Sequence, residues 1–215
     1  MQKEKSYAAS HKGLRNILSQ FSLLAGKTNF SNIQDVEKLK KLGDDLFFLL
    51  PHHLHTENDD LLKPLEERVP GSSQHDLEDH EHLEKLQSDL AAQLSKLDGT
   101  QDEEAGHAFY LAFTNFHSQY LAHILQEELV TEQLLLANFL VEELQENSAR
   151  IMQKVEFPVL LLSLKYIIPA QSELENLKIL RMFKANAPAE ALQAVLDTIQ
   201  SEMREEEFNS LIHKM

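Results

Sequence analysis

Two segments of this 215-residue chain carry the same pair of side chains, an imidazole followed four residues later by a carboxylate. The first pair is His53 and Glu57, and the second is His123 and Glu127, 70 positions further along the chain. On an α-helix, residues four apart project from one face on successive turns, so both side chains can reach the same ion. The repetition therefore predicts two helices that each bring an imidazole and a carboxylate to a metal site.

One histidine precedes each pair at a similar interval, His11 before the first pair and His80 before the second. The chain is therefore interpreted as two similar helical hairpins. Four ligand-bearing helices favour an all-α fold, an up-down four-helix bundle with the site in its core. A single inward-facing histidine is more often a hydrogen-bonded core residue, and it is the other five candidates that favour a ligand.

A second imidazole, His82, competes with His80 for the third helix. His80 is preferred because leucines follow it after three and ten positions, just as Leu14 and Phe21 follow His11 after three and ten positions. Lysine and alanine stand at the corresponding positions after His82. The choice between the two imidazoles stays open at this point.

Apolar residues recur every three or four positions through the predicted helices, and both His–Glu pairs occupy these apolar stripes. A carboxylate on a buried stripe is costly unless it is paired or bound to a cation, so Glu57 and Glu127 favour a metal site. Glu128 points about 100° away around its helix and is the weaker candidate. The pattern predicts helices over about residues 7–24, from about 33, over 75–97 and over 103–146. Ser6 or Ser10 is expected to cap the first helix, and Gly26 is expected to end it. Ser31 or Asn32 is expected to cap the second helix.

The composition narrows the chemistry. The chain has no cysteine, which removes disulfides and thiolate metal sites, so any metal must be held by histidine and carboxylate. A formal net charge of -15 argues against nucleic acid and against an anionic membrane as partners. The longest apolar run, Val159–Leu162, is far too short to span a bilayer, and the N-terminal segment lacks a signal-peptide pattern. A cytoplasmic protein is expected.

The character of the sequence changes after residue 146. We expect a bundle with the dinuclear metal site over residues 1–146 and a helical C-terminal extension over residues 147–215. The extension holds no His-x-x-x-Glu pair. It is interpreted as a structural or homo-oligomerisation element packed on the bundle.

Four imidazoles and two carboxylates are enough for two metal ions bridged by the carboxylates, with coordination positions left open. Histidine and carboxylate without sulfur suit iron, manganese or zinc. Two such ions form a dinuclear centre that can bind a diatomic molecule or activate water. The ferritin-like di-iron class is disfavoured, because its motif is Glu-x-x-His and it relies on more carboxylates.

The whole constellation resembles the haemerythrin-like (HHE cation-binding) family over about residues 7–145. Less specifically, the Pro169–Ala170 and Ala187–Pro188 segments resemble the C-terminal part of some longer bacterial members. The segments that carry the main resemblance are His11–Arg15, His53–Asn58 leading to Pro64–Gly71, Glu78–His80, and His123 with Glu127 and Glu128.

The resemblance implies a four-helix bundle that holds two iron ions with oxo or hydroxo bridging. The ligands that it implies are His11, His53, Glu57, His80, His123 and Glu127. Family members bind or sense dioxygen, store or sense iron, or handle peroxide and nitric oxide. The sequence departs from the oxygen carriers at one position, because they place a second histidine four residues before the third-helix ligand.

Asp76 stands at that position in this chain. A carboxylate there favours oxidised iron and argues against simple reversible oxygen carriage. Whether Asp76 or Glu128 joins the coordination stays open.

Three hypotheses follow. The first is a non-haem di-iron protein that binds or senses dioxygen, reactive oxygen or nitrogen species, or iron. The second is an oxidase- or peroxidase-like di-iron enzyme, for which Tyr110, His107 and His117 are only weak hints. The third is a metal-free helical interaction module, in which each of six inward polar side chains would need its own buried partner.

Overall fold

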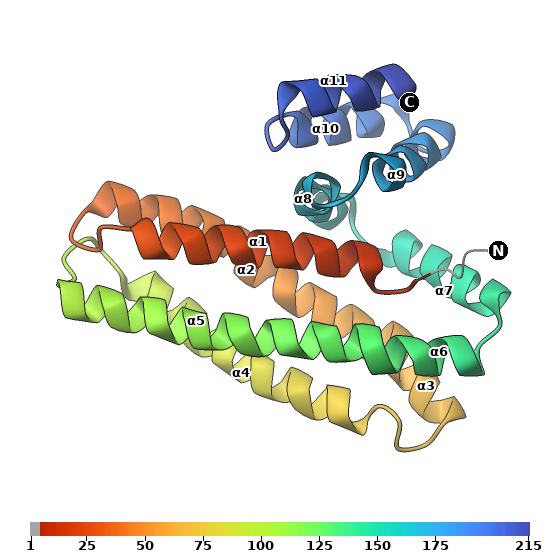
Figure 1. Ribbon diagram of the computed structural model, residues 1–215, viewed down its shortest axis with the longest axis horizontal. Helices are drawn as coiled ribbons and strands as arrows, with labels where there is room; N and C mark the ends of the chain where they lie inside the picture. Colours follow the sequence, from red (N-terminus) through yellow and green to blue (C-terminus); the bar gives the residue numbers. More distant parts are fainter. Residues whose placement is uncertain (1–4) are drawn as a thin grey trace. The chain divides into compact units, whose positions relative to one another are not determined.

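Every regular element over residues 5–215, the part of the chain that the computed structural model describes, is a helix (Figure 1). This confirms the predicted all-α class. Contacts divide the described residues into two units. The first unit holds the residues up to Ala8 together with 17–154, and the second holds 9–16 together with 155–215, so that the continuous helix α1 (Ala8–Lys27) contributes to both.

The first unit is a bundle of long helices joined by short connections. Helix α4 packs beside both α2 and α5, and α3 packs beside α6 (Figure 1). The long helices that hold the polar core residues are thereby placed next to one another. The elements are α2 (Ile33–Glu57), the π-helix η1 (Asn58–Leu62), α3 (Lys63–Arg68), α4 (Gln74–Lys96), α5 (Glu103–Gln126), the π-helix η2 (Glu127–Thr131), α6 (Glu132–Asn138) and α7 (Val141–Lys154).

Aromatic side chains fill the core of this bundle on the side of the α4–α5 connection. Phe21, from the second half of α1, lies at the centre, with ring centroids 4.4 Å from Phe113 and 6.0 Å from Phe47. Phe109 completes the group at 6.5 Å from Phe21. These tilted and edge-on pairs are the arrangements that aromatic rings prefer. These ring contacts pack α1, α2 and α5 against one another.

Helix α1 begins and ends differently from the prediction. Its N-cap residue is Tyr7, and the carboxylate of Glu132 accepts hydrogen bonds from the backbone N–H groups of Ser6 and Tyr7 at 3.1 and 3.3 Å. Neither Ser6 nor Ser10 is the N-cap, and no side chain of the described residues caps the first turn; Glu132 instead holds the backbone that leads into the helix. Gly26 does not end the helix, which runs on to Lys27. The other expectation holds, because Asn32 caps α2 by accepting from two backbone N–H groups.

The single helix predicted over residues 103–146 is interrupted. Phe139 adopts an extended conformation, with φ −120° and ψ 147°, and separates α6 from α7. Arg68 stabilises this break: its guanidinium lies 4.0 Å over the Phe139 ring and donates to the carbonyl of Asn138 at 2.7 Å. It also pairs with Glu143 through two hydrogen bonds of 2.8 and 2.9 Å. Arg68 comes from α3, far away in the sequence, so the local apolar pattern could not indicate the break.

The second unit has its own hydrophobic core. Helix α8 packs beside α10, and α9 beside α11. Residues 9–16 join this unit through Lys12, which donates to Glu175 at 2.6 Å, and Asn16, which donates to the carbonyl of Tyr166 at 3.0 Å. The helices are α8 (Phe157–Ile167), the 3-10 helix η3 (Ile168–Ala170), α9 (Glu173–Asn186), α10 (Ala189–Gln200) and α11 (Glu205–Lys214), and the core residues include Leu164, Ile168, Leu180, Val195 and Ile199.

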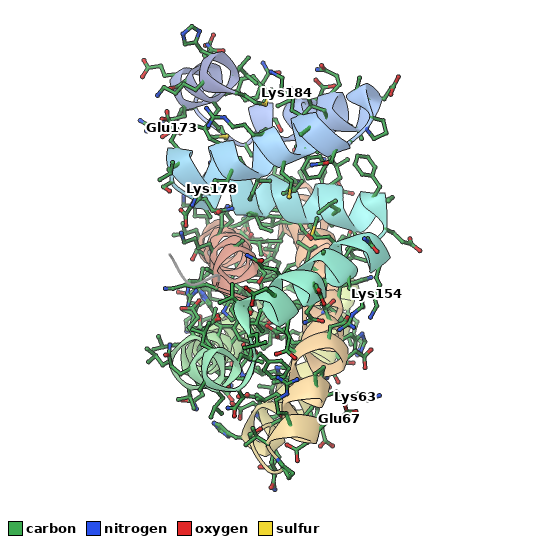
Figure 2. The ribbon with its side chains drawn as sticks, turned by 90° about the vertical axis from the view of Figure 1, so that its right-hand side faces the viewer. Lys63, Glu67, Lys154, Glu173, Lys178 and Lys184 are labelled. Carbon is green, nitrogen blue, oxygen red and sulfur yellow. The ribbon has the colours of Figure 1, made fainter. Side chains whose placement is uncertain are left out.

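Charged side chains cover the outside of both units. Glu173, Lys178 and Lys184 lie along α9, and Lys63 and Glu67 project from α3 (Figure 2). Glu173 pairs with Lys214 at 2.7 Å, which joins the first turn of α9 to the end of α11. Among the helices that the structure describes, none combines the length and the apolar character that crossing a bilayer requires.

Candidate metal centre

The two predicted His–Glu pairs both lie where an α-helix passes into a π-helix. His53 and Glu57 occupy the last turn of α2, directly before η1. His123 lies in the last turn of α5, and Glu127 is the first residue of η2. Single π-helical turns inside α-helices are found mostly at functional sites. The two halves of the sequence repeat therefore share a local backbone feature as well as a motif.

The structure brings Glu57, His80, His123 and Glu127 together in the bundle core. One potential ligand atom from each of these side chains lies within 4.8 Å of the other three, and all four residues are buried. The Nε2 atoms of His80 and His123 are 3.0 Å apart. His80 Nε2 is also 3.4 Å from Glu127 Oε1 and 3.7 Å from Glu57 Oε2. Within the two His–Glu pairs, Nε2 lies 3.1 Å from the carboxylate for His53 and 3.4 Å for His123.

Both imidazoles have a polar neighbour on the side away from the centre. His80 Nδ1 is 2.7 Å from Asn58 Oδ1, and His123 Nδ1 is 3.4 Å from Asp79 Oδ2. Asn58 Oδ1 is an acceptor, so the proton of the neutral His80 imidazole belongs on Nδ1. The 3.4 Å contact with Asp79 is too long to fix the tautomer of His123 in the same way. His80 Nε2 then presents a lone pair to the centre, and His123 Nε2 lies beside it. Carboxylate or amide contacts of this kind orient the histidine ligands of many metal sites.

The two Nε2 atoms lie at hydrogen-bond distance, 3.0 Å, and a cation held by both nitrogens would replace this contact. A separation of about 3 Å is also what two nitrogens have when each lies about 2.1 Å from one ion at a right angle. The donor set, imidazole nitrogen and carboxylate oxygen without sulfur, suits iron, manganese or zinc. The residues present therefore fit a metal ion.

The electrostatics of the centre lead to the same conclusion. Burial lowers the pKa of His80 to about 4, in spite of the opposing charge of Glu57, and burial also lowers the pKa of His123. Both imidazoles are therefore neutral near pH 7 and can donate a lone pair. Burial, and then the charge of Glu57, raise the pKa of Glu127 far above its ordinary range. A bound cation favours the ionised carboxylate and reverses this effect.

His11 is completely buried on α1. It lies in the stretch 9–16, which belongs to the second unit, so its place in the centre remains a prediction. His82 is exposed, and its Nε2 lies 2.8 Å from Gln119 Oε1, whereas the competing His80 is buried beside the other candidates. His107, the weak hint on α5, is exposed, and His117 is half-buried.

Asp76 is buried near the centre but has a different partner in this structure. Its Oδ2 accepts a hydrogen bond of 2.6 Å from the hydroxyl of Thr131. Burial raises the pKa of Asp76, and the hydrogen bond from Thr131 opposes that rise. The cluster of four potential ligands includes neither Asp76 nor Glu128. Asp76 is thus placed to influence the charge of the centre from outside that cluster.

The sequence did not identify Asn58 and Asp79 as functional residues. Each of them is adjacent to a predicted ligand, Asn58 to Glu57 and Asp79 to His80, but each contacts a histidine on a different helix. Only the pairing of α4 with η1 and with α5 reveals these contacts. Adjacency to a ligand was the one available signal, and it applies equally to residues that point away from the site.

The fold and the buried cluster together define a helical metal-binding domain. A comparison with protein families agrees: residues 5–135 match the model described as "Hemerythrin HHE cation binding domain". Because this match covers more than half of the chain, the chain belongs to that family, as the resemblance in its sequence indicated. No curated protein and no solved structure matched the chain.

Proposed function

We propose that the protein is a non-haem di-iron protein that binds or senses dioxygen, reactive oxygen or nitrogen species, or iron. The observation that carries the proposal is the pair of Nε2 atoms of His80 and His123, which lie 3.0 Å apart in the buried core. Asn58 holds the other nitrogen of His80 at 2.7 Å, and Asp79 lies 3.4 Å from that of His123. The cluster adds two buried carboxylates to these nitrogens. This donor set supports metal binding more strongly than it supports any metal-free role.

The proposed ligands are His11, His53, Glu57, His80, His123 and Glu127, which would hold two iron ions with an oxo or hydroxo bridge. Manganese and zinc suit the same donors. When bound, a pair of iron ions supplies electrons that oxygen or nitrogen oxides can accept. The protein contributes neutral imidazoles, a pair of carboxylates and a core from which water is largely excluded.

Asp76 supports a sensing or reactive role over simple oxygen carriage. It is buried, and its charge raises the pKa of Glu127, which places its negative charge close to the proposed ligands. Added negative charge near a metal stabilises the more highly charged, oxidised state. Residues 147–215 hold none of these ligands, and we propose that they form a structural or homo-oligomerisation element.

The test is the metal content per chain of protein purified from iron-supplemented cells, with absorption spectra recorded before and after dithionite and again in air. About two irons per chain are expected, with near-ultraviolet absorption that changes reversibly with the oxidation state. Zinc alone, or no metal, would contradict the di-iron proposal.

Two histidines of α5 provide a matched pair of variants. His123→Ala should lose most of the metal because His123 Nε2 is part of the cluster, whereas His107→Ala should retain it because His107 is exposed. Equal metal content in the two variants would show that the centre has been misplaced.

A further inference from the structure

Tyr120 has a buried hydroxyl group next to the candidate centre. The side chain is completely buried on α5, one turn before His123. Its hydroxyl has no hydrogen-bond partner among the residues that the structure describes. Buried tyrosine hydroxyls usually have a partner, because leaving a polar group buried and unpaired is costly. An unpaired hydroxyl in this position is therefore unusual.

The hydroxyl group is not needed to fill space. The buried stripe of α5 reads Phe109, Phe113, Phe116 and then Tyr120, so that three phenylalanines precede the single tyrosine. The Tyr120 ring packs 5.6 Å from that of Phe116, in the same manner as the neighbouring aromatic pairs. Phenylalanine would fill the position equally well. The stripe acquires a polar atom only at the aromatic position next to the proposed ligands.

The surroundings of Tyr120 place it beside the centre. Its ring lies edge-on to His123, with the centroids 6.1 Å apart. Burial, and then the charges of Glu57 and Glu127, raise the pKa of the phenol well above its ordinary value. Both of these carboxylates belong to the cluster of potential ligands. A phenol hydroxyl is an ordinary hydrogen-bond donor.

We propose that Tyr120 donates a hydrogen bond from its hydroxyl to a small anion held at the metal centre. The inference rests on the proposed function, because it requires a metal ion to hold the anion. Tyr120 is then a residue that binds the exogenous ligand rather than the metal. The Tyr120 hydroxyl favours ligands that present a hydrogen-bond acceptor atom toward α5. The phenol stays unpaired until such a ligand is present.

The probe is azide, titrated into the full-length, iron-loaded chain and followed by visible absorption. Tyr120→Phe removes the hydroxyl and keeps the ring. Tyr110→Phe is the matched control, because Tyr110 lies on the same helix, half-buried, with its ring stacked on that of the exposed His107 at 6.2 Å. We expect the dissociation constant of azide to rise about tenfold in Tyr120→Phe, the loss of one hydrogen bond, and to be unchanged in Tyr110→Phe.

Two further measurements, the iron content and the melting temperature, do not require the metal centre to bind azide. The iron content of Tyr120→Phe should equal that of the wild type. The melting temperature of its metal-free form should be equal or higher, because the substitution removes an unpaired buried hydroxyl. A markedly lower melting temperature would mean that the hydroxyl has a partner within the protein and would overturn the proposal.

The remaining outcomes separate this inference from the proposed function. An azide affinity within about twofold of the wild type overturns the role of Tyr120 and leaves the metal centre intact. A parallel loss of iron and azide also overturns it, because Tyr120 would then support the metal ligands. A wild-type chain that binds no metal overturns the proposed function itself.

Discussion

The side chain that orients His80 is not itself a proposed ligand. Asn58 Oδ1 lies 2.7 Å from His80 Nδ1 and fixes the proton on that nitrogen. Loss of such an outer partner typically lowers metal affinity by about 10–100-fold. We therefore expect Asn58→Ala to weaken metal binding by at least about tenfold in a chelator competition. Asp59→Ala, at an exposed position in the same π-helix, is the control, and equal affinities in the two variants would refute this role.

Glu127 makes the stability of the metal-free protein depend on pH. Its pKa is raised in the folded state, so its contribution to stability is fully present below about pH 4.5, the ordinary glutamate value, and is lost as the pH rises. Above about pH 7.5, His80 and His123 are largely neutral in both states, and this loss should dominate. The free energy of unfolding should then fall by at most about 1.4 kcal/mol per pH unit.

Urea unfolding of the metal-free protein at several pH values measures this slope. Glu127→Gln cannot ionise, so it should flatten the slope and should be more stable than the wild type at about pH 8. Glu104→Gln, at an exposed position on α5, should retain the slope of the wild type. Identical slopes in all three proteins would mean that Glu127 is ionised in the folded state without a metal.

At the residue scale, spacing predicted the candidates but not their surroundings. The intervals of four and 70 residues select two His–Glu pairs, and apolar residues at matching distances select His80 over His82. The spacing cannot indicate that Asn58 and Asp79 reach histidines on other helices. It also cannot separate Tyr120 from the phenylalanines of the same stripe. These properties depend on contacts between elements rather than on periodicity within one element.

At the scale of elements, α7 is held to the rest of the first unit by a small apolar cluster and by polar contacts around it. Leu144 is buried with Tyr7, Leu61, Leu65 and Leu135. On the same helix, the amide of Asn147 donates to the Asp60 carbonyl at 2.7 Å, and Lys154 pairs with the Asp60 side chain. The Lys154 side chain is 56% exposed, so this ion pair contributes little, and the apolar contact should dominate the attachment.

Leu144→Ala should therefore destabilise the protein by about 2–3 kcal/mol, the usual cost of truncating a buried leucine where the site can partly relax. Leu140→Ala is the control, because Leu140 is 67% exposed and its truncation should change stability by less than about 0.5 kcal/mol. Denaturant unfolding of both variants measures the difference. Equal effects would show that α7 is not held by this cluster.

The helices themselves were largely predictable, and the exceptions have physical causes. The start of α2, its asparagine cap and the all-helical class follow from local signals that the structure satisfies. The π-helices η1 and η2 were not predicted, because the apolar stripe continues through them. The break at Phe139 depends on Arg68, and the backbone that leads into α1 is held by Glu132, so both features depend on residues far apart in the chain.

At the scale of the whole molecule, the core of the first unit contains carboxylates that are costly to bury as anions when no metal ion is bound. Two carboxylates, Glu57 and Glu127, share the core with neutral imidazoles, and each follows a histidine by four residues at the entrance to a π-helix. The duplicated motif thus directs both halves of the bundle to one centre. Folding and metal binding should consequently be coupled, because the ligand atoms converge only in the folded chain.

Metal loading should therefore raise the melting temperature. At a free metal concentration about 100 times the dissociation constant, binding adds about 2.7 kcal/mol to the free energy of unfolding. For a chain of this length, that gain corresponds to a rise of roughly 5–10 °C. The measurement is thermal unfolding with and without iron for the wild type and two variants of α4. His80→Ala should lose most of the rise because His80 is buried among the proposed ligands, and His82→Ala should keep it because His82 is exposed. A rise that is equal in both variants would place the stabilising metal outside this core, and the absence of any rise would separate folding from metal binding.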